Sequence, residues 1–508
     1  MKLFLQQGAW DWDPQRYKYS AEQMMLTLFP GEKPEYPEED PSMLSQDADA
    51  ALFSLDRGPE ATTVTVRVLR EGKEEISSDS FPSGELDKSP EWAYHVIQHA
   101  LKIAFYRAGT AILGQEPPWG ALTGVRPVKL PTRAMKAGKT AGEAQKELEQ
   151  EYHVSTRRAR LAVDCARASI AVDSSLKPNE VSLYIGIPFC PTRCAYCSFV
   201  SADVARTMKL VGPYLEELCD EIAATGKVLK ESGLTVRSLY MGGGTPTTLS
   251  APQMDRVLTL CEEHLPLDGC TEYTVEAGRP DTISRAKLEV LARHKIGRIS
   301  INPQTLEDEV LEAIGRRHSA GDIDKAYAMA REVGFDCINM DLIAGLPRDT
   351  YEGFCRSLDG VLALDPENIT VHTLALKKGS TLMERGDPIP QGEEVARMLE
   401  YTLDTLRAAG YAPYYLYRQK YMSGSLENVG WAKPGTDSLY NIVMMEELQT
   451  VISVGGGGVT KLVDPDKGRI VRLPNPKYPH DYLTSREKIF GQKAEIAAFY
   501  AQSQGETL

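Results

Sequence analysis

The stretch VSLYIGIPFCPTRCAYC, residues 181–197, decides the fold and indicates the chemistry. An apolar run leads into Cys190, Cys194 and Cys197, which have the spacing C-x3-C-x2-C. Three thiolates on one short loop can hold three irons of a cubane [4Fe–4S] cluster, and the fourth iron then stays open to a small molecule. The alternative is a structural zinc loop, but zinc favours a fourth Cys or His close by. The remaining candidate, Cys165, lies on a predicted helix well upstream.

Length and composition are those of a soluble globular protein with two or three domains. The chain has 508 residues, of which 42% are hydrophobic and 25% are charged. No apolar run approaches the length of a membrane span, and residues 1–13 turn polar and acidic too soon for a signal peptide. We therefore expect a cytoplasmic protein whose cysteines form no disulfides.

The net charge of −14 argues against a protein that mainly coats nucleic acid, because phosphate binding needs a basic face. The local exception is residues 126–160, where glutamates offset the basic residues of the second half. The first half is predicted to be a loop and contains Arg126, Lys129 and Arg133. These three side chains can meet an anionic ligand or RNA.

From about residue 180, short apolar runs alternate with amphipathic helical segments six times. The predicted strands are residues 181–187, 236–243, 272–278, 298–304, 337–345 and 368–376. Strands that alternate with helices form a parallel sheet with right-handed crossovers. Six repeats are too few for a closed eight-fold barrel, so we expect an α/β fold with a partial (β/α)6 barrel. Sites in such sheets lie at the carboxyl ends of the strands, and the cysteines follow the first strand.

Changes in composition and in hydrophobic pattern along the chain predict three domains. Residues 1–175 form an N-terminal α+β accessory domain, 176–385 the partial barrel, and 386–508 a C-terminal mixed α/β domain. In the first domain we expect a long helix that ends at Gly109. In the third, VISVGGGGVTKLV (residues 451–463) predicts one strand broken by four glycines.

The second predicted strand ends in GGGTPT, residues 242–247. Glycines let backbone N–H and C=O groups approach a ligand closely. The motif is not a phosphate loop, because no Lys follows the glycines. By itself it predicts only a tight turn, but one strand downstream of three cysteines it favours a ligand beside the cluster.

Together these residues resemble the radical S-adenosylmethionine (SAM) superfamily. There, SAM chelates the open iron, and one electron from the cluster cleaves it to a 5′-deoxyadenosyl radical that abstracts a substrate hydrogen. The runs LYIGIPFCPTRCAYCSF, GGGTPT, VEAGRP, NPQTLEDEVLEAIGRRHS and NMDLIAGLPRDT are similar to the oxygen-independent coproporphyrinogen III oxidase family over about residues 180–460. LTGVRPVKL and the long N-terminal domain resemble its coproporphyrinogen dehydrogenase branch.

The resemblance implies a set of SAM contacts. These are Tyr184, Tyr196, Gly243, Gly244, Thr245, Glu276, Gln304, Arg316, Asp341 and the backbone of Ala375. Carboxylate and amide oxygens suit ribose hydroxyls, and a guanidinium suits a methionine carboxylate. Arg316 can instead pair with Glu312 on its own helix, and Glu276 can be an ordinary strand-end charge.

Two positions depart from the family pattern. Members often have a His immediately before the Ile-Pro-Phe-Cys run, where this chain has Gly186. That change removes an imidazole near the cluster. Some members also carry a fourth Cys two residues after the third, where this chain has Phe199. Cluster ligation survives both changes.

The resemblance implies oxidative decarboxylation of two propionates of coproporphyrinogen III to vinyls, which gives protoporphyrinogen IX in haem biosynthesis. Arg126, Lys129 and Arg133 would receive substrate carboxylates, and a reduced flavodoxin or ferredoxin would donate electrons. One alternative is a haem carrier of the same family, with His318 or His372 as ligand. Another is a different radical SAM reaction, either a tetrapyrrole methylation with ring opening or an RNA modification, although the acidic net charge disfavours RNA. Because open-iron clusters are oxygen-labile, we expect anaerobic function.

Overall fold

The computed structural model describes residues 1–5, 13–37, 48–197, 202–375, 380–419, 426–464 and 468–505. It divides into two compact units, and the border falls between Val163 and Asp164, inside helix α5 (Thr156–Asp173). The first unit is built from the residues before this border, and the second, the barrel unit, from nearly all that follow. None of the described helices is long and apolar enough to cross a membrane.

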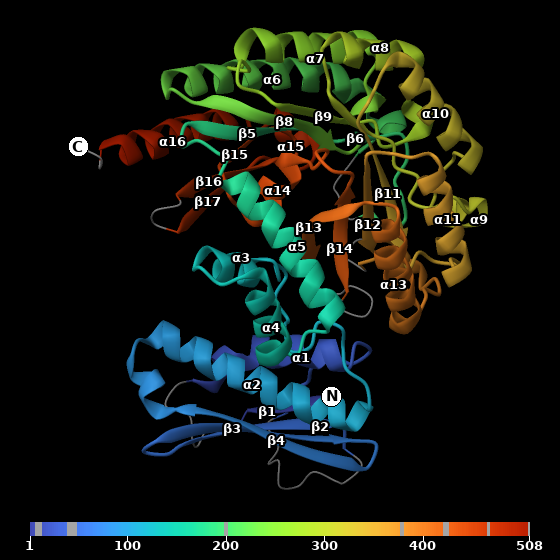
Figure 1. The fold of residues 1–508 in the computed structure, drawn as a ribbon. Helices are drawn as coiled ribbons and strands as arrows, with labels where there is room; N and C mark the ends of the chain where they lie inside the picture. Colours follow the sequence, from blue (N-terminus) through green and yellow to red (C-terminus); the bar gives the residue numbers. More distant parts are fainter. Residues whose placement is uncertain are drawn as a thin grey trace. The chain divides into compact units, whose positions relative to one another are not determined.

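The first unit is a four-stranded sheet with helices packed on one face (Figure 1). The strands lie in the order β1 (Lys2–Leu5), β2 (Ala50–Arg57), β3 (Ala61–Arg70) and β4 (Lys73–Pro82). Helices α1 (Lys18–Leu28) and α2 (Pro90–Leu113) share the core of this sheet, whereas α3 (Lys129–Lys136) and α4 (Ala141–Tyr152) pack on each other. The unit also contains the short 3-10 turns η2 (Pro14–Tyr17) and η4 (Ser83–Asp87). The valines of β3 alternate with polar residues, so one face of the strand enters the core.

Two predictions for the first unit are wrong. Helix α2 does not end at Gly109 but continues to Leu113. The next residue, Gly114, adopts the left-handed conformation (φ +68°) that ends the helix. Gly109 instead allows close packing, because a Cβ there would lie 2.6 Å from a methyl group of Leu28. The stretch predicted as a basic loop also contains helix α3.

The barrel unit contains all six predicted strands as one parallel array. They are β5 (Glu180–Ile187), β8 (Thr235–Gly243), β9 (Glu272–Glu276), β10 (Arg298–Ser300), β11 (Ile338–Ala344) and β12 (Asn368–Thr373). The helices that follow them are α6 (Val204–Glu231), α7 (Ala251–His264), α8 (Arg285–Arg293), α9 (Asp308–Ala313), α10 (Ala320–Val333), α11 (Tyr351–Ala363) and α13 (Gly392–Ala408). Figure 1 shows the long helices on the outer face of the curved sheet. The predicted partial (β/α)6 barrel is confirmed.

Five further strands extend the barrel's sheet at both edges. Strands β14 (Glu427–Ala432) and β13 (Ala412–Arg418) continue it beyond β12, and β15 (Val451–Gly455), β16 (Val459–Asp464) and β17 (Arg469–Pro474) beyond β5. The remaining elements are β6 (Phe189–Cys190), β7 (Ala202–Asp203), η5 (Pro246–Thr248), η6 (Pro280–Thr282), α12 (Thr381–Arg385), α14 (Leu439–Glu446), α15 (Pro479–Leu483) and α16 (Arg486–Gly505). The predicted domain borders near residues 175 and 385 stay predictions.

The glycine run between β15 and β16 forms a hairpin turn. Gly455 and Gly457 both have positive φ angles, +82° and +78°, which glycine adopts without steric cost. The strand predicted here is broken at the glycines as expected, but its two parts fold back on each other as antiparallel strands, which was not predicted. Strand β15 pairs in parallel with β5, so the turn lies at the end of β5 that leads to the cysteines.

A buried ion pair holds this turn in place. The Glu221 carboxylate on α6 accepts hydrogen bonds from Gly455 N (2.7 Å), Asn475 Nδ2 (3.0 Å) and Tyr482 Oη (2.5 Å), and Lys493 Nζ on α16 lies 2.7 Å away. The Glu221 side chain is fully buried and that of Lys493 is 5% exposed. A charge buried this deeply destabilises the folded state unless an opposite charge pairs with it.

Lys493→Met should therefore lower the free energy of unfolding of the barrel unit by about 3–5 kcal/mol, because it leaves the Glu221 charge buried without its cation. Lys488→Met, at an exposed position of the same helix, is the matched control and should change little. Urea denaturation of both variants measures the difference, and equal effects would contradict this account of the ion pair.

Candidate active site

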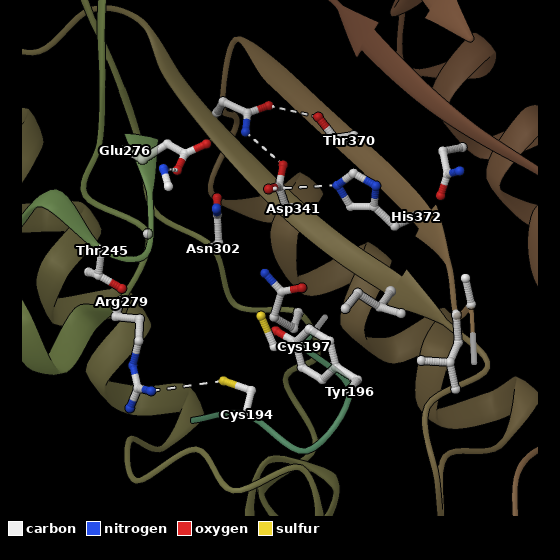
Figure 2. Close-up of a pocket in the computed structure, with 18 of the residues that line it drawn as sticks. Cys194, Tyr196, Cys197, Thr245, Glu276, Arg279, Asn302, Asp341, Thr370 and His372 are labelled. Atoms are coloured by element: carbon white, nitrogen blue, oxygen red, sulfur yellow. Dashed lines mark hydrogen bonds and ion pairs between the residues drawn. The ribbon is translucent and has the colours of Figure 1, made fainter. Parts of the chain in front are cut away.

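A cavity of about 360 Å3 opens at the carboxyl ends of the barrel strands (Figure 2). The barrel topology brings its wall together from six separate strand ends. The lining includes Cys190, Cys194, Tyr196, Cys197, Gly243, Gly244, Thr245, Glu276, Gln304, Arg316, Asp341 and Ala375. The structure therefore gathers all three predicted cluster ligands and nine of the ten predicted SAM contacts around one space.

The cysteine loop, residues 190–197, forms one end of this cavity. Cys194 is buried, and Cys190 Sγ lies 3.5 Å from Thr245 Oγ1. The backbone holds the loop in place, since Ala195 N donates to Ile314 O (3.0 Å). Tyr196 is aimed into the same space and its hydroxyl accepts from Arg316 Nη2 (3.1 Å).

The glycine-rich end of β8 lies directly against the residues that lead into the cysteine loop. Gly244 N donates to Ile187 O and Thr245 N donates to Phe189 O, both at 2.7 Å. A Cβ on Gly244 would lie 2.5 Å from Phe189 O, and Gly243 has a φ of +111°. Only residues without side chains fit at these two positions, which gives the GGGTPT motif a structural reason.

The residues present suit a [4Fe–4S] cluster. None of the described cysteines forms a disulfide, and three of them share one cavity. Within the described ranges, no three His, Cys, Asp or Glu side chains converge as they do around a single metal ion. A cubane cluster needs no such convergence, because each thiolate binds a different iron. Arg279 and Arg316 place two guanidinium charges beside Cys194, where they would balance the negative charge of a thiolate that ligates a cluster.

Two polar atoms in the cavity wall suit an amino-acid group. Arg316 donates to Asn302 O (2.9 Å) and to Tyr196, but the structure shows no hydrogen-bond partner for its buried Nε. Asn302 Oδ1 is likewise buried with no partner shown. A ligand carboxylate can accept from Arg316 Nε, and a ligand ammonium can donate to Asn302 Oδ1. The alternative pairing of Arg316 with Glu312 is not formed.

Two carboxyl groups face the cavity with opposite pKa shifts. Burial raises the pKa of Glu276 to about 7, although the Tyr240 hydroxyl, 2.5 Å away, opposes the shift. Burial also acts to raise the pKa of Asp341, but His372 and the Asn339 amide outweigh it and hold that pKa below its ordinary value. The site therefore presents one carboxyl that can carry a proton near neutral pH and one carboxylate.

Several predicted residues lie elsewhere. Tyr184 is behind the cavity wall, stacked on Tyr240 and Tyr440 with ring centroids 6.3 and 6.4 Å apart. Of the two candidate haem ligands, His372 lines the cavity, whereas His318 is buried 4.0 Å from Asp281.

The predicted substrate residues Arg126, Lys129 and Arg133 belong to the first unit, and Phe199 lies outside the described residues.

Other residues that line the cavity were not predicted from the sequence. They are Arg279, Asn302, Asn339, Thr370, Tyr415, Tyr417, Asn428, Asn441 and Met445, among others. Arg279 lies three positions after Glu276 at a strand end, which was a usable signal. Tyr415 and Tyr417 share one face of β13 through the two-residue strand period, but tyrosines in a strand are as typical of core packing as of a binding site.

The missing histidine at position 186 also has a structural reason. A Cβ on Gly186 would lie 2.4 Å from Gly456 O, because the glycine turn after β15 packs against the end of β5. Tyr214 Oη donates to Gly186 O (2.6 Å) and accepts from Gly456 N (2.7 Å), which fixes the approach. The turn occupies the space that a side chain at this position would need.

Comparison with known proteins agrees with this architecture. Residues 184–359 match the Radical SAM superfamily. The oxygen-independent coproporphyrinogen-III oxidase-like protein HemZ of Bacillus subtilis (strain 168) is 39% identical over 435 residues, which are 85% of this chain and 86% of that protein. The heme chaperone HemW of the same organism is 33% identical over 322 residues, 61% of this chain and 80% of that protein.

Among solved structures, coproporphyrinogen III oxidase (HemN) from Escherichia coli, titled a radical SAM enzyme, has a TM-score of 0.50 at 23% identity. The match covers 63% of this chain and 72% of that one, and it supports the fold alone. A partial barrel with three cysteines at its carboxyl end defines a radical SAM protein. The chain belongs to the oxygen-independent coproporphyrinogen III oxidase-like family of that superfamily. Members of the superfamily bind a [4Fe–4S] cluster and SAM, as predicted.

Gly186→His, which restores the residue common in the family, should destabilise this protein by at least about 1–3 kcal/mol through overpacking against Gly456. Gly491→His is the matched control, because a Cβ at that position of α16 meets nothing within 4 Å. Denaturant midpoints compare the two variants. Wild-type stability in Gly186→His would show that the turn does not constrain the site.

The free energy of unfolding of Glu276→Gln, relative to that of wild type, should increase as pH rises. Because the pKa of Glu276 is raised from 4.5 to about 7 in the folded state, wild type loses stability as pH rises between those values, and the neutral glutamine does not. Thermal unfolding of both proteins at several pH values measures the difference, with Glu263→Gln on the exposed face of α7 as control. A difference that is constant with pH, or larger in acid, would contradict the assignment.

Proposed function

We propose that this protein is an oxygen-independent coproporphyrinogen III dehydrogenase. It would convert two propionate groups of the substrate to vinyl groups with loss of CO2 and form protoporphyrinogen IX. The observation that carries the proposal is the cysteine-lined cavity, in a chain that shares 39% identity over 85% of its length with a coproporphyrinogen-III oxidase-like protein. Each conversion removes CO2, one hydrogen atom and one electron from the propionate arm. The hydrogen atom would pass to the 5′-deoxyadenosyl group that SAM supplies, and the electron to a separate one-electron acceptor.

Cys190, Cys194 and Cys197 would hold the cluster. When bound, the cluster and SAM together supply one-electron chemistry that can remove a hydrogen atom from an unactivated carbon. The chain's own task is to bind and orient. Arg316 Nε and Asn302 Oδ1 would take the carboxylate and ammonium of SAM, and the Asp341 carboxylate would accept from ribose hydroxyls.

Glu276 would hold a proton beside the bound cofactor. Its carboxyl accepts from Tyr240 Oη and from Gly243 N (3.3 Å), so its position is fixed at the glycine-rich wall. With a pKa raised to about 7 by burial, it can hydrogen-bond either as donor or as acceptor near neutral pH. This gives the site a proton carrier that does not depend on the histidine missing at position 186.

The cavity sets a limit on how a tetrapyrrole can bind. Its volume of about 360 Å3 is at the low end of ligand pockets, about 300–1,000 Å3. The arginines among the described lining residues, Arg279 and Arg316, both lie beside the cysteine loop. The macrocycle would therefore present one propionate arm to the cavity and keep its other carboxylates outside it. Arg126, Lys129 and Arg133, which belong to the first unit, stay the proposed substrate residues on the ground of the sequence resemblance alone.

The proposed reaction also needs an electron donor and a compartment in which it takes place. A flavodoxin- or ferredoxin-type protein would reduce the cluster, and the protein would work in the cytoplasm under anaerobic conditions. The reaction consumes a tetrapyrrole that carries propionates and has no need for nucleic acid.

A second candidate is a haem carrier. It is favoured by the 33% identity to a heme chaperone and by His372, which lines the cavity with its Nε2 3.8 Å from Asp341. An imidazole with a carboxylate behind it is a common arrangement for a metal ligand. This candidate predicts tight haem binding that is lost in His372→Ala, with no change to added coproporphyrinogen.

Cys194→Ala should abolish conversion of coproporphyrinogen III, because one cluster ligand is lost. The assay is anaerobic, with reconstituted protein, SAM and a reductant, and mass spectrometry follows 5′-deoxyadenosine and the loss of two CO2 per tetrapyrrole. Cys355→Ala on α11, outside the cavity lining, is the matched control and should retain activity. SAM cleavage by wild type without any change in the tetrapyrrole would overturn the dehydrogenase proposal.

A further inference from the structure

Arg279 is a buried cation that donates hydrogen bonds to Asp281 and to the cysteine loop. It follows β9, immediately before η6, and is 3% exposed. Its Nε and Nη2 donate to the two carboxylate oxygens of Asp281, at 2.9 and 2.7 Å. This two-pronged geometry fixes the plane of the guanidinium more firmly than a single contact does. Asp281 thus determines where the third nitrogen points.

The third nitrogen, Nη1, reaches the cysteine loop. It donates to Thr192 Oγ1 (2.7 Å) and Thr192 O (3.3 Å), and it lies 3.9 Å from Cys194 Sγ. Figure 2 shows the guanidinium extended toward this sulfur. One side chain therefore holds the loop between the first two cysteines and places a positive charge beside the second.

A donor and a positive charge at a ligating sulfur change the energy of the cluster's redox states. Reduction adds negative charge, and a nearby cation stabilises the reduced state more than the oxidised state. Hydrogen bonds to the sulfurs and the local net charge are among the properties that set the potentials of such clusters. Because Arg279 is buried, solvent screens this effect little.

We propose that Arg279 is a positioning residue that raises the reduction potential of the cluster through Cys194, and that Asp281 holds it in the geometry required. Arg279 differs in this from Arg316, whose buried Nε has no hydrogen-bond partner among the described residues. The inference rests on the proposed ligation of the cluster by Cys190, Cys194 and Cys197, and it is independent of the substrate.

The test is the midpoint potential of the cluster in the full-length, anaerobically reconstituted protein. A redox titration followed by electron paramagnetic resonance compares wild type with Arg279→Gln, Asp281→Asn and Arg285→Gln. Arg285 is the matched control, because it pairs with Glu332 on the exposed surface of α8. Iron content and SAM affinity of each variant are measured alongside.

We expect the potential of Arg279→Gln to shift to a more negative value, with SAM affinity within about twofold of wild type, and Arg285→Gln to match wild type. The Asp281→Asn variant distinguishes two effects on the cluster potential, namely the loss of the Arg279 orientation and the removal of the Asp281 charge. Removing an anion alone would shift the potential to a more positive value, whereas loss of the Arg279 orientation shifts it to a more negative one. If Arg279→Gln cannot retain a cluster, the Asp281→Asn result decides by itself.

Three results would overturn the inference. One is an unchanged potential in Arg279→Gln, and another is a positive shift in Asp281→Asn. The third is a tenfold loss of SAM affinity in Arg279→Gln at an unchanged potential, which would make Arg279 a SAM contact. A wild-type protein that holds no cluster would instead refute the ligation on which the inference rests.

Discussion

The site depends on the parallel pairing of β5 with β8. This pairing places Gly186 opposite Gly242 and Ile187 opposite Gly243, so the cysteine loop and the glycine-rich turn leave the sheet side by side. The two hydrogen bonds from Gly244 and Thr245 then fix the turn against the loop. A one-residue slip in this register would move every side chain of β8 to the other face of the sheet and separate the two motifs.

Around this pair of strand ends, charge is arranged in two zones. The guanidiniums of Arg279 and Arg316 lie beside Cys194. The carboxyls of Glu276 and Asp341 lie along the neighbouring strand ends. A ligand that carries both a carboxylate and hydroxyl or ammonium donors fits such a division better than a uniformly anionic one. This arrangement accounts for the affinity for SAM that family membership implies, and it moves the recognition of substrate carboxylates away from the deepest part of the cavity.

Much of the barrel could be predicted from the sequence, because its strands are short apolar runs and its helices repeat apolar residues with the helical period. These two patterns alternate along the chain. The six barrel strands were found for this reason, whereas the cysteine loop was found from the spacing of Cys190, Cys194 and Cys197. The hairpin at Gly455 was missed because its glycines serve a turn that packs on Gly186, a contact between residues far apart in the chain. Gly109 was misread in the same way, since its role is contact with Leu28 and not helix termination. The place of Arg279 just after the β9 strand end was a signal for the site, but its contact with Cys194 was not, because only the folded chain brings the two together.

The central claim is that three cysteines hold one cluster with an iron open to SAM. Mössbauer spectroscopy of the iron-57-reconstituted protein, before and after SAM is added, tests it most directly. The account predicts about four irons per chain, of which one changes its spectrum when SAM binds while the others do not. A spectrum that SAM leaves unchanged, or a protein that takes up zinc and no iron–sulfur cluster, would contradict it.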